Sequence, residues 1–236
     1  GELFKALCIC FGKPVEKFDF SYVDKDNQFH VDYDLTPQQF YEKYVGLSLD
    51  DYVSIINSPT KDKPYEKTYT VKYLGNVVED GIRYLNLSME DLKMLVVTQL
   101  KAGEPVWFGS DCGKFGSRSE GIWDPDSFVY GELLGGMDLT LTKEQRLDYR
   151  DSAMDHAMVI TGVNLDADGK PDRWKIENSW GEDVGKKGYF IASDKWFDEF
   201  VYQVIIEKKY LKDKWKELLQ ENPIELEPWD PMGTLA

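Results

Sequence analysis

The sequence predicts an α+β protein, with helices early in the chain and an antiparallel sheet late in it. Two observations lead to this prediction. Helix-capping patterns open three segments in the first 150 residues, and strand-like alternation with a hairpin turn dominates the last third. Helices and strands that are segregated along a chain are typical of α+β folds. We therefore expect an antiparallel β part with flanking helices.

The first 35 residues contain short apolar and alternating stretches. Residues 1–11 are apolar enough for a buried helix or strand, which Gly12-Lys13-Pro14 ends. The stretches 18–20 and 29–33 alternate in the manner of edge strands, around a turn at Asp26-Asn27. This part of the chain is therefore predicted to hold one apolar element and a small hairpin.

Each of the three predicted helices begins at a serine or threonine that suits the N-cap position. The signal is fullest at Thr36, because Pro37 suits the first helical position and Gln39 completes a capping box. After Ser88, apolar side chains recur at helical spacing until Gly103. The predicted helices are 37–45, 89–102 and 143 onward.

Strand patterns fill most of the chain after residue 155. His156–Val163 is nearly all apolar, as a buried strand is, and the hairpin turn Asp166-Ala167-Asp168-Gly169 follows. Further strands are predicted at 68–74, 105–108, 173–177, 188–192 and 201–207, and an amphipathic helix at 212–220. We expect three regions, which are a helical and cleft-wall region at 1–140, a β-rich half at 141–222 and a C-terminal tail at 223–236.

Composition limits the class of protein. The 236 residues are 42% hydrophobic, and 28 basic against 43 acidic residues give a net charge of 28 − 43 = −15. An acidic surface repels phosphate groups, so nucleic acid is not expected as a partner. No apolar window approaches the roughly 18 residues of a membrane helix, so we expect no membrane partner. Three cysteines cannot all pair, which fits a reducing cytoplasm.

A histidine that opens a predicted strand and an asparagine that follows a later strand are the main candidates for catalysis. His156 and Asn178 flank a short hairpin, so their side chains are predicted to meet. An asparagine oxygen can hold one ring nitrogen of a histidine and leave the other to face a thiol. Trp180 would shield that hydrogen bond from water. These residue types indicate a cysteine hydrolase.

Structural roles are the alternative for each of these residues. A lone histidine that opens a buried strand is more often structural, the asparagine could form an Asx turn, and the tryptophan could be ordinary core. The combination of His156 with Asn178-Ser179-Trp180-Gly181 favours the catalytic interpretation. His30 is the only other histidine, and its alternating polar strand predicts an exposed position.

The motifs Asp155-His156-Ala157-Met158 and Asn178-Ser179-Trp180-Gly181 resemble those of the papain-like cysteine peptidases, most closely the bleomycin hydrolase and aminopeptidase C branch. The segments Val106–Asp111 and Trp229–Ala236 resemble that branch as well. The resemblance extends over the whole chain, which corresponds to the C-terminal half of such an enzyme. It implies a papain-like fold, peptide substrates and no metal or organic cofactor.

The resemblance also implies a role for each site residue. His156 would be the base and acid, and Asn178 would orient it. Asp111 would belong to the cleft wall and substrate pockets, and Trp180, beside the site, would also bind substrate. The tail would enter the cleft, where the carboxylate of Ala236 would meet the free amino group of a peptide and block longer substrates. A cytoplasmic, hexameric aminopeptidase is expected.

None of the three cysteines matches the nucleophile of such enzymes. Cys8 and Cys10 lie 148 and 146 residues before His156, within the roughly 130–150 residues usual for papain-type enzymes. They sit in an apolar run, however, where burial would make a thiol inert. Cys112 lies in the predicted cleft wall. The chain opens on Gly1, and we expect the nucleophile in an N-terminal half outside it, without which this chain would be inactive.

Two other functions remain open at this stage. The chain could be a non-catalytic peptide-binding or assembly module on the same scaffold, or part of an endopeptidase of the same fold. A thiol-directed probe distinguishes an enzyme from a binding module. Removal of the tail distinguishes an aminopeptidase from an endopeptidase.

Overall fold

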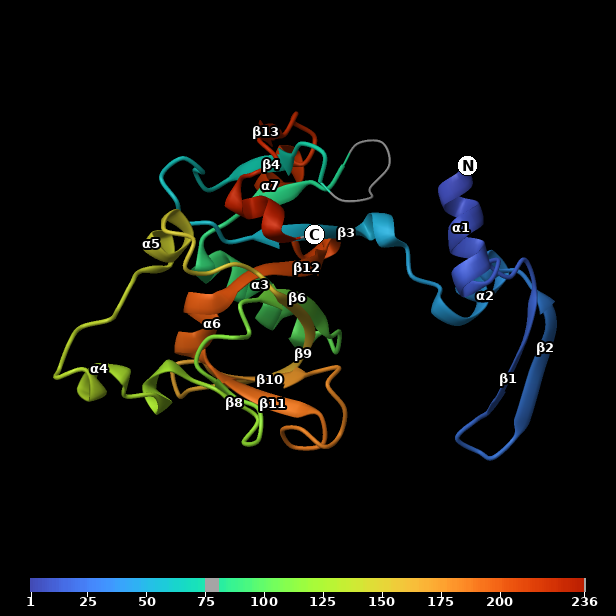
Figure 1. The fold of residues 1–236 in the computed structure, drawn as a ribbon, viewed down its shortest axis with the longest axis horizontal. Coiled ribbons are helices and arrows are strands. Elements are labelled where there is room, and N and C mark those ends of the chain that lie inside the picture. The colour runs from blue at the N-terminus through green and yellow to red at the C-terminus, as the bar shows by residue number, and fades with distance from the viewer. Residues whose placement is uncertain (75–80, 236) are drawn as a thin grey trace. The chain divides into compact units, whose positions relative to one another are not determined.

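The computed structural model describes residues 1–74 and 81–235 (Figure 1). Two compact units make up the chain, Gly1–Leu49 (unit 1) and Asp50–Ala236 (unit 2). The sequence predicted boundaries at residues 140 and 222 instead of at 49. Those two boundaries fall inside unit 2, because strands from all three predicted regions join one sheet there.

Unit 1 holds two helical segments and a two-stranded antiparallel sheet. Asn27, with a φ of 59°, lies in the turn of the hairpin, as predicted. The capping box at Thr36 is confirmed, since Thr36 Oγ1 accepts from Gln39 N and Gln39 Oε1 accepts from Thr36 N. The elements are α1 (Glu2–Phe11), β1 (Phe18–Val23), β2 (Phe29–Leu35), α2 (Pro37–Phe40) and a π-helical turn at Tyr41–Val45.

Helix α1 corrects one prediction. It was expected to be buried, but it has no buried residue, and the side chains of Leu3, Ile9 and Phe11 are 75%, 77% and 84% exposed. The apolar sequence suffices for a helix, but nothing within unit 1 covers it. Cys8 is half-buried and Cys10 is exposed. Burial is therefore not a reason to exclude these two thiols, and only the lack of a matching motif remains.

Unit 2 is built on one mostly antiparallel sheet of eleven strands. The strand order is β13-β4-β5-β3-β12-β6-β9-β10-β11-β8-β7, with parallel pairs only at β3·β5, β4·β13 and β8·β11 in the described chain. The strands are β3 (Tyr52–Ile56), β4 (Lys67–Val71), β5 (Tyr84–Asn86), β6 (Val106–Ser110), β7 (Gly116–Ser117), β8 (Ile122–Trp123), β9 (His156–Leu165), β10 (Pro171–Glu177), β11 (Tyr189–Ser193), β12 (Val201–Glu207) and β13 (Ile224–Leu226).

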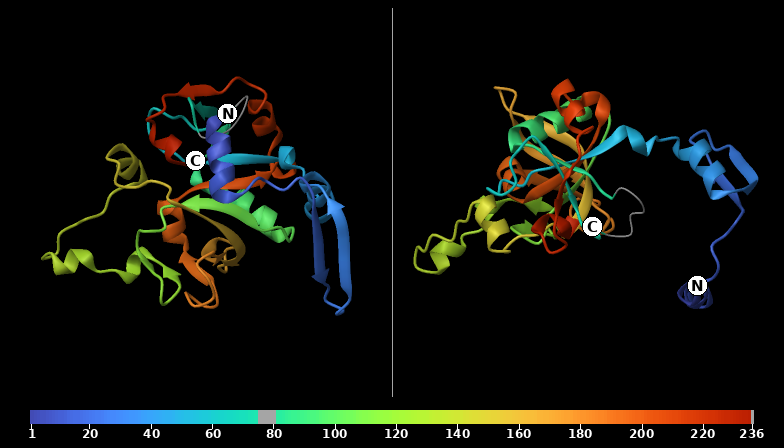
Figure 2. Two further views of the ribbon diagram at one scale, coloured as in Figure 1. Left: turned by 45° about the vertical axis from the view of Figure 1, so that its right-hand side comes forward. Right: turned by 90° about the horizontal axis from the view of Figure 1, so that it is seen from above.

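Short helices cover this sheet. Helix α3 packs on β6, β9 and β12, and α6 packs on β10, β11 and β12 (Figure 2). Lys93 of α3 pairs with Asp194 and Asp198 of α6, at 2.8 and 2.7 Å. The helices are α3 (Met89–Lys101), α4 (Tyr130–Leu133), α5 (Lys143–Asp148), α6 (Asp194–Phe200) and α7 (Asp213–Leu218), with 3₁₀ turns at Leu49–Asp51, Pro125–Ser127, Lys208–Tyr210 and Pro231–Leu235.

The N-caps at Ser88 and Thr142 are confirmed, because each side chain accepts a hydrogen bond from a backbone N–H three residues on. Helix α6 was not predicted. Its cap is Ser193, which accepts from Trp196 N at 3.3 Å. The seven residues are too few to show a clear helical period, and the apolar face consists of Trp196, Phe197 and Phe200.

The main core lies between the sheet and helices α3 and α6. Its largest side chains are aromatic, and the ring centroids of Trp174 and Phe197 are stacked 4.2 Å apart. Burial of such large rings stabilises the fold. Strand β9 was expected to be buried throughout, but only Met158 and Ile160 are. The reason is that one face of an antiparallel sheet packs on the core and the other stays accessible.

No helix within residues 1–74 and 81–235 is both long enough and apolar enough to cross a membrane.

Candidate active site

The strands β9 and β10 bring the two predicted catalytic residues together. The two strands pair antiparallel with Glu177 opposite Val159, so the first residue of β9 and the residue after β10 lie at the same end of the hairpin. His156 Nε2 lies 2.9 Å from Asn178 Oδ1, and the pair is half-buried. The predicted meeting of these side chains is therefore present in the folded chain.

The hydrogen bonds of Asn178 define the protonation of the imidazole. Asn178 Oδ1 also accepts from the backbone N–H of Ser179 at 2.8 Å, which identifies this atom as the amide oxygen. His156 Nε2 must then carry the proton that it donates to Oδ1. The lone pair is left on Nδ1, which has no hydrogen-bond partner among residues 1–74 and 81–235. A neutral imidazole in this tautomer can accept a proton from a neighbouring acid.

Trp180 covers this hydrogen bond. Its ring stacks on His156, with centroids 5.0 Å apart and planes 17° apart. Trp180 also meets Trp123 and Phe190 edge-on, which ties it to the main core. The Arg118 guanidinium carbon lies 4.2 Å from the Trp180 ring centroid. Sequence reasoning missed Arg118, because a single arginine in a Gly/Ser-rich turn carries no local signal.

Asp155 fixes the start of β9. Its backbone N–H donates to Ser110 O at 3.0 Å, and its Oδ1 accepts from Cys112 N at 2.9 Å. Ser110 is also the partner of His156 in the β6·β9 ladder. These bonds hold the backbone from which the imidazole projects. No separate role was predicted for Asp155, although its position next to His156 is a signal that could have suggested one.

Asp111 lies in a buried hydrogen-bond chain. It is 6% exposed, and its Oδ2 accepts from Ser152 Oγ at 2.7 Å. Ser152 Oγ in turn accepts from the Tyr202 hydroxyl at 2.7 Å. Burial raises the pKa of the Asp111 carboxyl. Within the described chain this carboxyl is turned inward, and its role in substrate binding stays a prediction.

Cys112 has the properties of an unreactive thiol. Burial, followed by the negative charge of Asp155, raises its pKa to about 12. Only a thiolate attacks a carbonyl readily, so very little of the reactive form is present near neutral pH. The low reactivity agrees with the prediction that Cys112 is not the nucleophile.

Comparison with known proteins places the chain in a family. The model of the Peptidase C1-like family matches residues 1–233. The chain belongs to this family. Aminopeptidase C of Streptococcus thermophilus is 52% identical over 238 residues, which cover 100% of this chain and 53% of the relative. Bleomycin hydrolase of Rattus norvegicus is 40% identical over 243 residues, with the same shares covered.

A solved structure agrees with these relatives. The crystal structure of PepW from Lactobacillus rhamnosis HN001 superposes with a TM-score of 0.95 at 54% identity, over 100% of this chain and 53% of that one. The chain thus spans about half the length of the curated relatives that it matches. The predicted resemblance and the α+β papain-like fold are confirmed.

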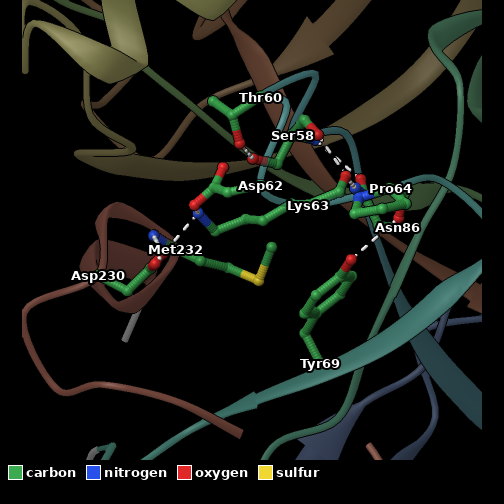
Figure 3. Close-up of polar contacts among 9 residues, drawn as sticks. All are labelled: Ser58, Thr60, Asp62, Lys63, Pro64, Tyr69, Asn86, Asp230 and Met232. Atoms are coloured by element: carbon green, nitrogen blue, oxygen red, sulfur yellow. Dashed lines mark hydrogen bonds and ion pairs between the residues drawn. The ribbon is translucent and has the colours of Figure 1, made fainter. Parts of the chain in front are cut away.

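In this member of the Peptidase C1-like family, the described part of the C-terminal tail packs against the rest of unit 2. Strand β13 pairs parallel with β4, and Met232 is buried against Tyr69 and Tyr84. Asp230 forms an ion pair with Lys63 (Figure 3). The predicted contact of Ala236 with substrate lies outside the described residues. The sequence did not predict the role of Lys63 either, because its partner Asp230 is far away in the sequence.

Among the described residues, no group of three or more His, Cys, Asp or Glu side chains is arranged to hold a metal ion.

Proposed function

We propose that this chain provides the histidine and asparagine of a Cys-His-Asn site in a cysteine aminopeptidase. The observation that carries the proposal is the 2.9 Å contact between His156 Nε2 and Asn178 Oδ1, with Nδ1 left without a partner in the described chain. An imidazole held in this way is prepared to take a proton from a thiol. Names of the relatives, Aminopeptidase C and Bleomycin hydrolase, support the reaction class.

The proposed reaction proceeds through an acyl-thioenzyme. His156 takes the thiol proton at Nδ1, and the thiolate adds to the scissile carbonyl carbon. The imidazolium then returns the proton to the leaving amine as the C–N bond breaks. Water, deprotonated by the same imidazole, hydrolyses the thioester and restores the thiol. Asn178 keeps the ring in position throughout, and no metal or organic cofactor takes part in these steps.

The nucleophilic cysteine is proposed to come from a segment outside this chain. The raised pKa of Cys112 supports this, and Cys8 and Cys10 lack the motif of such a nucleophile. The remaining proposals follow from the family resemblance. They are peptide substrates with free N-termini, selection by the C-terminal tail through Ala236, a homohexamer and a cytoplasmic location.

The test uses the longer parent protein and iodoacetamide. We expect one cysteine outside residues 1–236 to be alkylated rapidly, and His156→Ala to slow that alkylation and abolish hydrolysis of aminoacyl nitroanilides. His30→Ala is the matched control, because His30 is an exposed histidine paired with Asp24 at 2.7 Å. Rapid alkylation that is unchanged by His156→Ala, or that falls on Cys112, would contradict the proposal.

A further inference from the structure

The C-terminal tail is held by a buried lysine. Lys63 is 4% exposed, and its Nζ lies 3.1 Å from Asp230 Oδ2 and 2.7 Å from Asp62 Oδ2. Asp230 is 15% exposed, whereas Asp62 is 67% exposed. A buried ammonium needs a partner, and Asp230 is the partner that is buried with it. The buried ammonium of Lys63 is therefore stabilised by Asp230 of the tail, and Asp230 is held in place by Lys63.

The same carboxylate also shapes the tail. Asp230 Oδ1 accepts from Met232 N at 2.9 Å, and the Asp230 carbonyl accepts from Gly233 N at 2.8 Å. This turn directs the Met232 side chain into a small core, where it is 4% exposed. We call Lys63, Asp230 and Met232 the tail anchor. Its polar and apolar parts are coupled, because the Asp230 carboxylate both pairs with Lys63 and accepts the hydrogen bond from Met232 N.

The tail anchor lies beside the segment that leads to His156. A cavity of about 230 Å³ is lined by Asp230 and Met232 on one side and by Met154 on another. Met154 packs over Gly109 so closely that a Cβ there would lie 1.9 Å from the Met154 sulfur. Met154 is therefore tightly packed in the lining of the cavity, and it lies two residues before His156 in the sequence. Movement of the anchored tail would change the space around the segment that leads to His156.

We propose that Lys63 is a positioning residue that determines specificity. By holding Asp230 it keeps the tail segment of Asp230 and Met232 at this cavity. In the proposed function the tail selects peptides with a free N-terminus, so the position of Asp230 affects that selection. The inference rests on the proposed aminopeptidase function, and it adds the residue that keeps the tail in place. Without the lysine, Asp230 loses its buried counter-charge, and the tail is released towards water.

The side chain of Lys63 can be changed without undoing its loop. The backbone of Lys63 is held separately, since its N–H donates to Thr60 O at 3.0 Å and its carbonyl accepts from Asn86 Nδ2 at 2.9 Å. Lys63→Met keeps an apolar stem that reaches to the ε position and removes the ammonium group. The substitution is therefore expected to act on the tail and to leave the loop in position.

The experiment measures a ratio of activities in the longer parent protein. kcat/KM is determined for a peptide substrate with a free amino group and for the same peptide acetylated at its N-terminus. We expect Lys63→Met to lower the free-to-acetylated ratio by about tenfold or more, the scale of one charge-assisted contact. Asp230→Asn should have the same effect. Partial unfolding lowers both activities equally and leaves the ratio unchanged.

The chain offers a matched control in Lys72. Lys72 also pairs with the C-terminal segment, at 3.3 Å from Glu225 and 2.9 Å from Glu227, but it is 34% exposed. Lys72→Met should leave the ratio unchanged, because solvent-exposed ion pairs contribute little to the free energy that keeps a segment in place. A parent protein with no activity on the free-amine peptide would refute the proposed function. An active parent whose ratio changes when residues 230–236 are removed, but not in Lys63→Met or Asp230→Asn, would overturn the role of Lys63.

Discussion

Two polar pairs each join two segments of unit 2, and they differ in whether a hydrogen-bonding position is left without a partner. His156 and Asn178 are half-buried, and one ring nitrogen has no partner in the described chain. Lys63 and Asp230 are nearly enclosed, and both charged groups are engaged. A pair that performs chemistry must keep one bonding position open, whereas a pair that fixes a segment is most effective when fully satisfied.

The largest effect is expected for His156→Ala. Removal of the proposed general base should lower kcat/KM of the parent protein on the order of 10⁴-fold or more. The melting temperature should stay within about 2 °C, because the side chain is half-buried and contributes little to the core. Steady-state kinetics and calorimetry on the same preparation check both parts. A large loss of stability would show that His156 has a structural role, as Lys63 and Asp230 have.

Asn178→Ala should have the next largest effect. The imidazole loses the acceptor that holds Nε2–H, so kcat should fall by about 10²-fold while KM changes much less. Asn178→Asp keeps an acceptor for His156 and for Ser179 N–H and should retain more of the activity. A defect confined to KM would contradict the orienting role.

Trp180→Ala should have a smaller effect of the same kind. The indole stacks on His156 at 5.0 Å and keeps water from the bond to Asn178. Its loss should lower kcat by about tenfold, because a wetter hydrogen bond orients the ring less firmly. Trp180→Phe preserves a ring and should lose only a few-fold. Equal losses in the two variants, measured as kcat, would show that stacking is not what matters.

The contrast between the two pairs also explains what the sequence could predict. His156 and Asn178 sit at the open end of one hairpin, so local strand patterns were enough to bring them together. Lys63 meets Asp230 only because β4 and β13, which are far apart in the chain, pair in one sheet. No pattern of apolar residues near Lys63 or Asp230 in the sequence predicts that pairing. Non-local contacts of this kind depend on the assembled sheet.

The same distinction between local and non-local information holds for the helices. The starts at Thr36, Ser88 and Thr142 were predicted, because a cap is a hydrogen bond within three residues. The exposure of α1 was not predicted, since burial depends on what else lies nearby. Asp111 illustrates the point at the site. Its burial and its bond to Ser152 depend on the pairing of β6 with β12 and on the segment that precedes β9.

The smallest effect on activity is expected at Cys112. With its pKa raised to about 12 by burial and by Asp155, thiolate is scarce at pH 8 and increases as the pH rises towards 12. Alkylation of Cys112 by iodoacetamide should therefore be slow at pH 8 and accelerate about tenfold per pH unit, which peptide mass spectrometry can follow. Cys112→Ser should leave kcat/KM of the parent unchanged. Fast alkylation at pH 8 with loss of activity would make Cys112 the sulfur beside His156, and the nucleophile would then lie within this chain.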